Sequence, residues 1–257
     1  TKEVIDGKIT KGEIVPKLSY LTKLPNKKVE IPAVKATNNV EKTKIYFVDV
    51  KGAAQTEFRV GDVTNLKYDA TGEYFKAFLT NYPLGGAFNS RINLNLREDK
   101  GWTYGARSGF NGDKYTGEFS FSSGIRAPAT DSALTEVLKE LKDYAANGVT
   151  EEEMNFMKSA LGQIDAQRYE TGFQKAGFIG RILEYNLPAD YVDKQNEMLK
   201  NITKAELDAV AKKWLNVDKM NILLVGDKEK VLPTLQKFGY EIIELDIDGN
   251  PVQKKGF

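Results

Sequence analysis

Alternation of apolar and polar positions predicts two pairs of strands in the first half of the chain. KIYFVDV at 44–50 and QTEFRVG at 55–61 are rich in β-branched and aromatic residues, which favour extended structure. The short connection KGAA between them makes a hairpin plausible. Further along, WTYGARSGF and GEFSFSS flank Asn111-Gly112, a dipeptide typical of hairpin turns.

Apolar residues spaced three and four apart predict two helices between these strand pairs. The first covers about 71–81 and ends before Pro83, because a proline disfavours helical geometry in the residue before it. The segment LGG at 84–86 is interpreted as a sharp break. The second helix begins at Ala87, carries Phe88, Ile92 and Leu96 on one face, and is terminated by Gly101.

Four further helices are predicted after the second strand pair. The same apolar spacing places them at about 131–147, from Thr150 onward, at 171–186 and at 204–215. Two of them begin with the Thr-x-x-Glu spacing of a capping box. These boxes are Thr150 with Glu153 and Thr203 with Glu206.

The C-terminal part predicts a strand, a short helix and a strand. MNILLVG at 220–226 has the pattern of a buried strand, DKEKVLPTLQKFG that of a short helix, and EIIELDI that of a closing strand. Paired strands followed by a block of helices are typical of an α+β fold, here a largely antiparallel sheet covered on one face by helices. Residues 1–40 contain Pro16, Pro25 and Pro32 and no sustained period, so we expect an N-terminal arm or linker before a domain at 41–257.

The composition argues against several classes of function. Lys+Arg 37 against Asp+Glu 36 gives a net charge of +1, so no basic surplus favours a nucleic-acid partner, and no apolar run reaches the length of a membrane span. The absence of cysteine and histidine excludes thiolate and imidazole zinc sites and Ser-His or Cys-His catalysis within this chain. The chain begins at Thr1, and we expect a processed protein or a piece of a longer one.

Three polar motifs have ordinary structural explanations. The run Glu151-Glu152-Glu153 lies in the first turn of a predicted helix, where the helix dipole favours negative charge. Gly85-Gly86 lacks the surrounding pattern of a phosphate-binding loop and is interpreted as a tight turn. DIDGN at 246–250 lacks the full spacing of a calcium loop, which leaves a polar turn. We therefore expect no metal or cofactor site in this chain.

The stretch LREDKGWTY at 96–104 contains the residues of greatest functional interest. On a helix with 100° per residue, Arg97 points about 140° away from the centre of the Phe88/Ile92/Leu96 face. Arg97 is then a solvated residue near a helix end or a functional one. Tyr104 is likewise either a half-buried strand aromatic or a functional group, and the pattern alone leaves both interpretations open.

The block YPLGGAFNSRINLNLREDKGWTY at 82–104 resembles the second-half signature of the zinc peptidases that include pitrilysin, insulin-degrading enzyme and the mitochondrial processing peptidase. A looser similarity extends over about 45–247. The matching elements are Leu84-Gly85-Gly86, Ser90-Arg91, Leu96-Arg97-Glu98, Gly101 and Tyr104.

In that family two similar α+β halves enclose a chamber, and only the first half carries the inverted zinc motif H-x-x-E-H. The second half supplies an arginine and a tyrosine to the substrate, and Arg97 and Tyr104 match those positions. The resemblance thus implies the substrate-binding, non-metal half of a zinc metalloendopeptidase acting on peptides. Its Zn²⁺ is expected in a partner half, fused or separate, and the chain is not expected to act alone.

Two alternatives stay open. Relatives of this fold serve as non-catalytic binding or structural core subunits, and this chain could keep the fold without assisting hydrolysis. An independent hydrolase that uses carboxylates alone is a third interpretation. The sequence does not determine the cellular compartment of the protein, and we favour the bacterial periplasm or cell envelope slightly over the cytoplasm.

Overall fold

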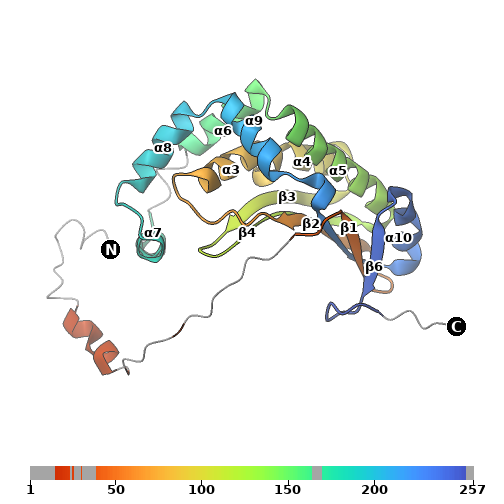
Figure 1. Cartoon of the computed structure of the whole chain (residues 1–257), viewed down its shortest axis with the longest axis horizontal. Helices are drawn as coiled ribbons and strands as arrows, with labels where there is room; N and C mark the ends of the chain where they lie inside the picture. Colours follow the sequence, from red (N-terminus) through yellow and green to blue (C-terminus); the bar gives the residue numbers. More distant parts are fainter. Residues whose placement is uncertain (1–14, 24, 26–29, 31–38, 164–169, 253–257) are drawn as a thin grey trace.

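The computed structural model describes residues 15–23, 25, 30, 39–163 and 170–252. They form a six-stranded sheet with a layer of helices above it (Figure 1). This arrangement confirms the predicted α+β fold. The strands are β1 (Lys44–Asp49), β2 (Gln55–Val63), β3 (Thr103–Gly112), β4 (Gly117–Arg126), β5 (Asn221–Gly226) and β6 (Glu241–Leu245).

The strand order is β3-β4-β2-β5-β1-β6. The contacts β3–β4, β4–β2 and β2–β5 are antiparallel, whereas β5–β1 and β1–β6 are parallel. The predicted hairpin between β1 and β2 is wrong, because β5 lies between these two strands. Its Ile222 and Leu224 are fully buried, and burying them requires a central position in the sheet. Local alternation identified both strands but not their partners.

The helices follow the predicted periodicity with one exception. They are α3 (Glu73–Asn81), α4 (Arg91–Asn93), α5 (Thr130–Asn147), α6 (Glu151–Gln163), α7 (Gly172–Tyr185), α8 (Tyr191–Asn201), α9 (Lys204–Trp214) and α10 (Lys228–Leu235). Helix α8 was not predicted. Its sequence YVDKQNEMLKN is mostly polar, and Tyr191 and Leu199 are its buried residues. Both predicted capping boxes are present, at Thr150 and at Thr203.

The region between α3 and β3 departs from the expected pair of regular helices. The first helix ends at Asn81, before Pro83, as predicted. The chain then continues through a π-helical turn at Tyr82–Gly86, whose start tolerates a proline because no N–H donor is needed there. The second helical segment starts only at Arg91 and passes into a π-helical turn at Leu94–Asp99. Phe88 therefore lies outside the helix and is 51% exposed, while Ile92 and Leu96 are buried as predicted.

The second hairpin is confirmed, but its turn directly follows the expected dipeptide. Asn111 and Gly112 are the last residues of β3, paired with Glu118 and Gly117. The turn is Asp113–Thr116, in which the Asp113 carboxylate accepts hydrogen bonds from the backbone N–H groups of Tyr115 and Thr116. An aspartate that binds its own following backbone in this way favours a turn as strongly as Asn-Gly.

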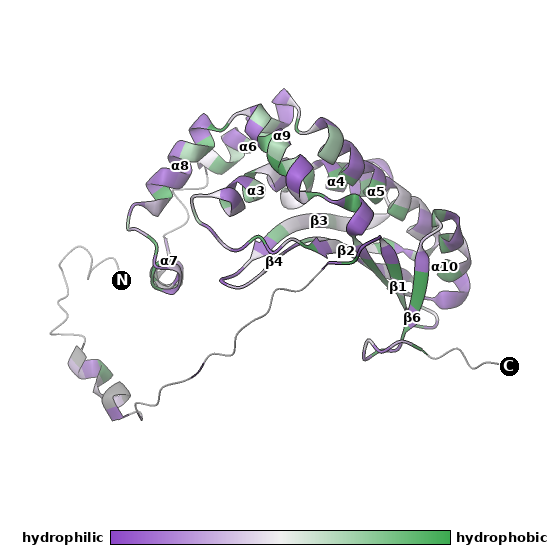
Figure 2. Cartoon of the chain, in the orientation of Figure 1, coloured by the Kyte–Doolittle hydropathy of each residue, from purple (hydrophilic) through white to green (hydrophobic). Residues whose placement is uncertain are grey.

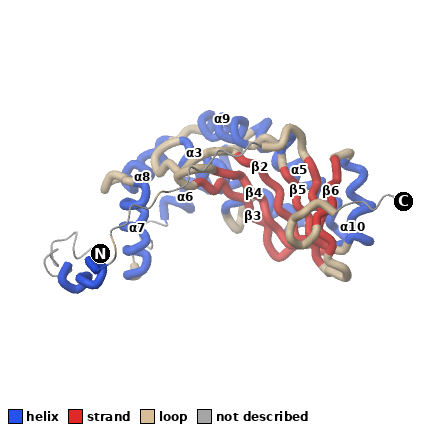
Figure 3. The backbone as a smooth tube through the Cα atoms, turned by 60° about the horizontal axis from the view of Figure 1, so that its bottom comes forward, coloured by secondary structure: helices blue, strands red, loops and turns tan. Residues whose placement is uncertain are grey.

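The core lies between the sheet and the helices. Apolar residues line the inner faces of the helices and one face of the sheet, while polar residues cover the outside (Figure 2). Figure 3 shows the opposite face of the sheet, over which no described helix packs. Helices thus cover one face of the sheet, as predicted. No described helix is both long and apolar enough to cross a membrane.

The predicted arm at 1–40 is described only in part. Val15–Lys23 forms a 3-10 helix, and its residues Pro16 to Tyr20 are exposed. Pro32 lies outside the described residues, and the domain boundary near residue 40 stays a prediction. At the other end, DIDGN is a polar turn as expected, since Asp246 accepts N–H groups of Asp248 and Asn250.

Candidate functional site

Arg97 and Tyr104 lie on either side of a sharp chain reversal. Arg97 belongs to the π-helical turn Leu94–Asp99, and Tyr104 is the second residue of β3. Gly101 has a φ of +61°, a left-handed conformation that glycine adopts without strain. The N–H groups of Gly101 and Trp102 donate to the carbonyls of Arg97 and Leu96, at 3.1 and 3.0 Å. These bonds confirm the predicted helix end and fix the start of β3 against it.

A β-bulge holds Tyr104 away from the sheet. The register of β3 against β4 shifts by one residue between Thr103 and Ala106, which is the signature of a bulge. The Ser123 hydroxyl closes it by donating to Thr103 Oγ1 and the Gly105 carbonyl, at 3.0 and 2.9 Å. Tyr104 is 91% exposed, so the half-buried interpretation of this residue is wrong and its hydroxyl faces solvent.

The Arg97 side chain is held by stacking rather than by a hydrogen-bonded carboxylate. Its guanidinium carbon lies 4.4 Å from the centre of the Phe88 ring, a distance typical of a cation–π contact. Within the described part of the chain, its buried Nη1 atom has no hydrogen-bond partner, although Glu98 Oε1 lies 3.5 Å away. Arg97 is thus outside the core, as predicted, and its side chain is partly exposed.

Asn93 connects the Phe88 platform to the strand that carries Tyr104. Its side chain is 1% exposed, donates to the Phe88 carbonyl at 2.7 Å and accepts from the Ala106 N–H at 2.9 Å. Sequence analysis missed this residue, because a single asparagine in a helical stretch gives no periodic signal.

The outer edge of β3 is completed by side chains from the neighbouring helical segment. Besides Asn93, Asn81 donates to the Ser108 carbonyl at 2.7 Å, and Tyr74 donates to the Phe110 carbonyl at 3.0 Å. A Cβ on Gly85 would lie 2.1 Å from Ser108 Oγ. Gly85 therefore allows this segment to pack closely against β3. The sequence predicted only its role in a tight turn.

We expect Asn93→Ala to lower the free energy of unfolding by roughly 2–3 kcal/mol, because the buried Ala106 N–H and the partly buried Phe88 carbonyl lose their partner. Urea denaturation of the chain measures this loss. The matched control is Asn111→Ala, since Asn111 is an exposed asparagine of β3 and surface changes usually stay within about 0.5 kcal/mol. Equal stability of the two variants would contradict the role given to Asn93.

Arg91 has a structural role beside this site. It donates two hydrogen bonds to Glu153, at 2.8 and 2.7 Å, and one to Asp143 at 2.9 Å. Burial raises the pKa of Glu153, but hydrogen bonds from Arg91 and Thr150 outweigh burial and hold that pKa below its ordinary value. The acidic run at 151–153 thus provides a helix cap, as predicted, and Glu153 also forms an ion pair with Arg91.

The structure does not test whether Arg97 and Tyr104 bind the same ligand. Arg97 and Tyr104 both lie outside the core and are joined by a closed reversal. Among the described residues no contact joins the two side chains, so their convergence on one ligand stays a prediction. The described residues also contain no cluster of three or more His, Cys, Asp or Glu that could hold a metal. This site offers hydrogen-bond donors.

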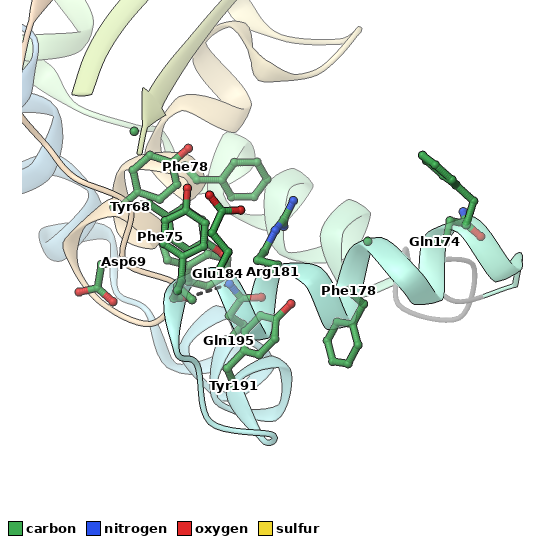
Figure 4. Close-up of a pocket in the computed structure, with 16 residues that line it drawn as sticks. Tyr68, Asp69, Phe75, Phe78, Gln174, Phe178, Arg181, Glu184, Tyr191 and Gln195 are labelled. Atoms are coloured by element: carbon green, nitrogen blue, oxygen red, sulfur yellow. Dashed lines mark hydrogen bonds between the residues drawn. The ribbon is translucent and has the colours of Figure 1, made fainter. Parts of the chain in front are cut away.

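A separate cavity of about 730 Å³ lies at the far end of β3 (Figure 4). It is bounded by α7, α3, α8 and the loop before α3, and Gly112 of β3 forms part of its wall. Sequence analysis missed it, because its lining comes from five separate segments that no single motif connects.

The peptidase M16 inactive-domain model matches residues 3–161. Among solved structures, the chain is similar to a peptidase M16 inactive domain from Pseudomonas fluorescens, with 24% identity and a TM-score of 0.73 over 85% of this chain and 52% of that one. A protease from Helicobacter pylori gives 14% identity and 0.72, over 85% and 53%. The periplasmic protease PqqL from Escherichia coli gives 15% and 0.66, over 86% and 24%.

These structural similarities show a shared fold. The chain spans about half the length of the first two structures and a quarter of the third. No curated protein matches the chain in sequence.

Proposed function

Because this chain belongs to the family of peptidase M16 inactive domains, we propose that it is the substrate-binding, non-metal half of a zinc metallopeptidase acting on peptides. The observation that carries this proposal is the geometry around Gly101. An exposed tyrosine on a β-bulge and a partly exposed arginine stacked on Phe88 flank one chain reversal, at the two positions where the family places its substrate-binding pair.

Arg97 and Tyr104 would act as hydrogen-bond donors to a backbone carbonyl of the bound peptide. The guanidinium stays charged at any physiological pH and offers several donors in a fixed plane. Stacking on Phe88 at 4.4 Å orients that plane before substrate arrives, so little ordering is needed on binding. Such donors stabilise negative charge that develops on the carbonyl oxygen during hydrolysis.

The zinc would come from a partner half, since the described residues of this chain supply no ligand cluster. When bound there, the metal polarises the scissile carbonyl and activates water. The residues of this chain would position the peptide against it. A non-catalytic binding or structural subunit is the rival function, and it predicts that hydrolysis does not depend on Arg97 or Tyr104.

Reconstitution tests the division of labour between the halves. We expect the isolated chain to hold no stoichiometric zinc and to hydrolyse no peptide, because it contains neither histidine nor cysteine. Joined to a half that carries H-x-x-E-H, it should give one zinc per complex and turnover of a quenched fluorescent peptide. Elemental analysis and fluorescence measure both quantities. One tightly held zinc in the isolated chain would contradict the proposal.

A further inference from the structure

The cavity at the far end of β3 has two facing walls. Helix α3 and the loop before it contribute aromatic rings on one side, and one face of α7 forms the other side. Figure 4 shows Phe78 of α3 and Arg181 of α7 directed into the same space. A volume of about 730 Å³ lies within the range usual for ligand sites.

The lining is aromatic and close to neutral. Eight of its sixteen residues carry aromatic rings, namely Tyr68, Tyr74, Phe75, Phe78, Phe173, Phe178, Tyr185 and Tyr191. The amide of Gln195 and the hydroxyl of Tyr74 already donate to backbone carbonyls, at 2.7 and 3.0 Å. Arg181 and Glu184 on α7 have opposite charges, and Asp69 in the loop before α3 adds one negative charge. With half of its residues aromatic, the cavity suits an apolar group better than an anion.

Helix α7 explains why the space between the walls stays open. Its sequence GFQKAGFIGRILEY is apolar over half its length, yet none of its residues is buried. Phe173 and Leu183 are 89% and 77% exposed. The helix contacts its surroundings through ring pairs, Tyr68 with Tyr185 at 4.2 Å and Phe178 with Tyr191 at 5.5 Å, and so stands apart from the core.

A glycine in the middle of α7 leaves one wall of the cavity without a side chain. Gly177 lines the cavity in the middle of α7, and a Cβ built there meets nothing within 4 Å. Gly112 lines it from β3. Because the centre of α7 presents bare backbone toward the aromatic wall, a bulky side chain from outside can enter between them.

We propose that this cavity binds an aromatic or large aliphatic side chain of the peptide substrate. The strand that carries Tyr104 at its start ends in the cavity wall at Gly112. Eight residue steps of about 3.4 Å separate the two points by roughly 27 Å, which an extended peptide of about eight residues spans. This inference rests on the proposed function for the identity of the occupant, and it adds a determinant of substrate choice.

Two glycines of α7 provide a matched pair of variants. Gly177→Leu places a side chain in the cavity, whereas Gly180→Leu places the same side chain three residues further on, where a Cβ also meets nothing within 4 Å and which is not part of the lining. Both changes replace a helical glycine and should raise helix stability by a similar amount. Only the first should block binding.

The test uses NMR spectra of the ¹⁵N-labelled chain with two capped pentapeptides. One has phenylalanine at its centre and alanine elsewhere, and the other is all alanine. We expect the phenylalanine peptide to shift the amide signals of Gly112 and Gly177, with an affinity at least tenfold above the alanine peptide. Gly177→Leu should abolish the shift at Gly112, and Gly180→Leu should retain it.

Equal affinity for the two peptides, or equal binding by Gly177→Leu and Gly180→Leu, would overturn the proposal. If Gly177→Leu unfolds the chain, Gly177→Ala and Phe178→Ala replace it, and unchanged binding in both would again overturn the proposal. The assay requires no zinc half and no turnover. Its outcome is therefore independent of whether Arg97 and Tyr104 assist hydrolysis.

Discussion

Replacing Tyr104 by phenylalanine should lower kcat/KM for peptide hydrolysis by about 10²–10³ in the zinc-containing assembly, with no loss of fold. The change removes one hydroxyl and keeps the ring. Loss of a single donor to a developing oxyanion typically has an effect of this size. Because Tyr104 is 91% exposed, the free energy of unfolding should stay within about 0.5 kcal/mol of wild type. Steady-state kinetics and urea denaturation measure the two quantities.

Arg97→Ala should give a comparable loss of kcat/KM, and Arg97→Lys should recover little of it. Lysine keeps the positive charge but loses the planar fork that stacks on Phe88. The matched control is Arg107→Ala, since Arg107 is an exposed arginine of β3, the strand that carries Tyr104, and should leave turnover unchanged. If Tyr104→Phe and Arg97→Ala both retain full turnover with zinc still bound, the non-catalytic binding subunit becomes the better account.

Sequence patterns predicted elements better than they predicted which elements meet. Alternation of apolar and polar residues predicted both β1 and β2. Strand β5, which follows β2 by about 160 residues in the chain, lies between them in the sheet, and no local pattern encodes that partner. Capping boxes at Thr150 and Thr203 were predicted because all their atoms lie within four residues. Helix α8 was missed because its sequence YVDKQNEMLKN is mostly polar.

In the candidate site, too, local features were predicted and tertiary contacts were not. The direction of Arg97 away from the core followed from helical spacing, even though the segment contains a π-helical turn. Phe88 was assigned to the core face on the same argument and lies outside the helix instead, stacked beneath Arg97. The role of Asn93 depends on two backbone groups five and thirteen residues away. Tertiary contacts of this kind leave no period in the sequence.

Asp62 is a buried carboxylate with no evident function. It lies on the helix-covered face of β2 and is 8% exposed, and its Oδ1 atom has no hydrogen-bond partner in the described part of the chain. Burial raises its pKa to about 7, although a backbone hydrogen bond partly opposes this. The native state therefore retains a proton that the unfolded chain, with an ordinary pKa near 4, has already lost at neutral pH.

The sign of the resulting pH dependence follows from proton counting. Between about pH 4 and pH 7 the native state binds more protons at Asp62 than the unfolded state does, so the free energy of unfolding falls as pH rises. Three pKa units correspond to on the order of 4 kcal/mol. Above pH 7 both states are ionised and the full destabilisation is present. Below pH 4 Asp62 is protonated in both states, and its burial then lowers the free energy of unfolding only a little.

Asp62→Asn should therefore stabilise the chain by on the order of 4 kcal/mol at pH 8 and by little at pH 4, because the amide keeps the shape and cannot ionise. Urea denaturation of wild type and variant at pH 4, 6 and 8 measures the difference, in which all other titrating groups cancel. Glu57→Gln is the control, since Glu57 is an exposed carboxylate on the open face of the same strand, and it should change stability by less than about 0.5 kcal/mol at pH 8. A stability difference for Asp62→Asn that is the same at all three pH values would show that the carboxylate is already ionised in the folded chain, with a partner that its surroundings do not reveal.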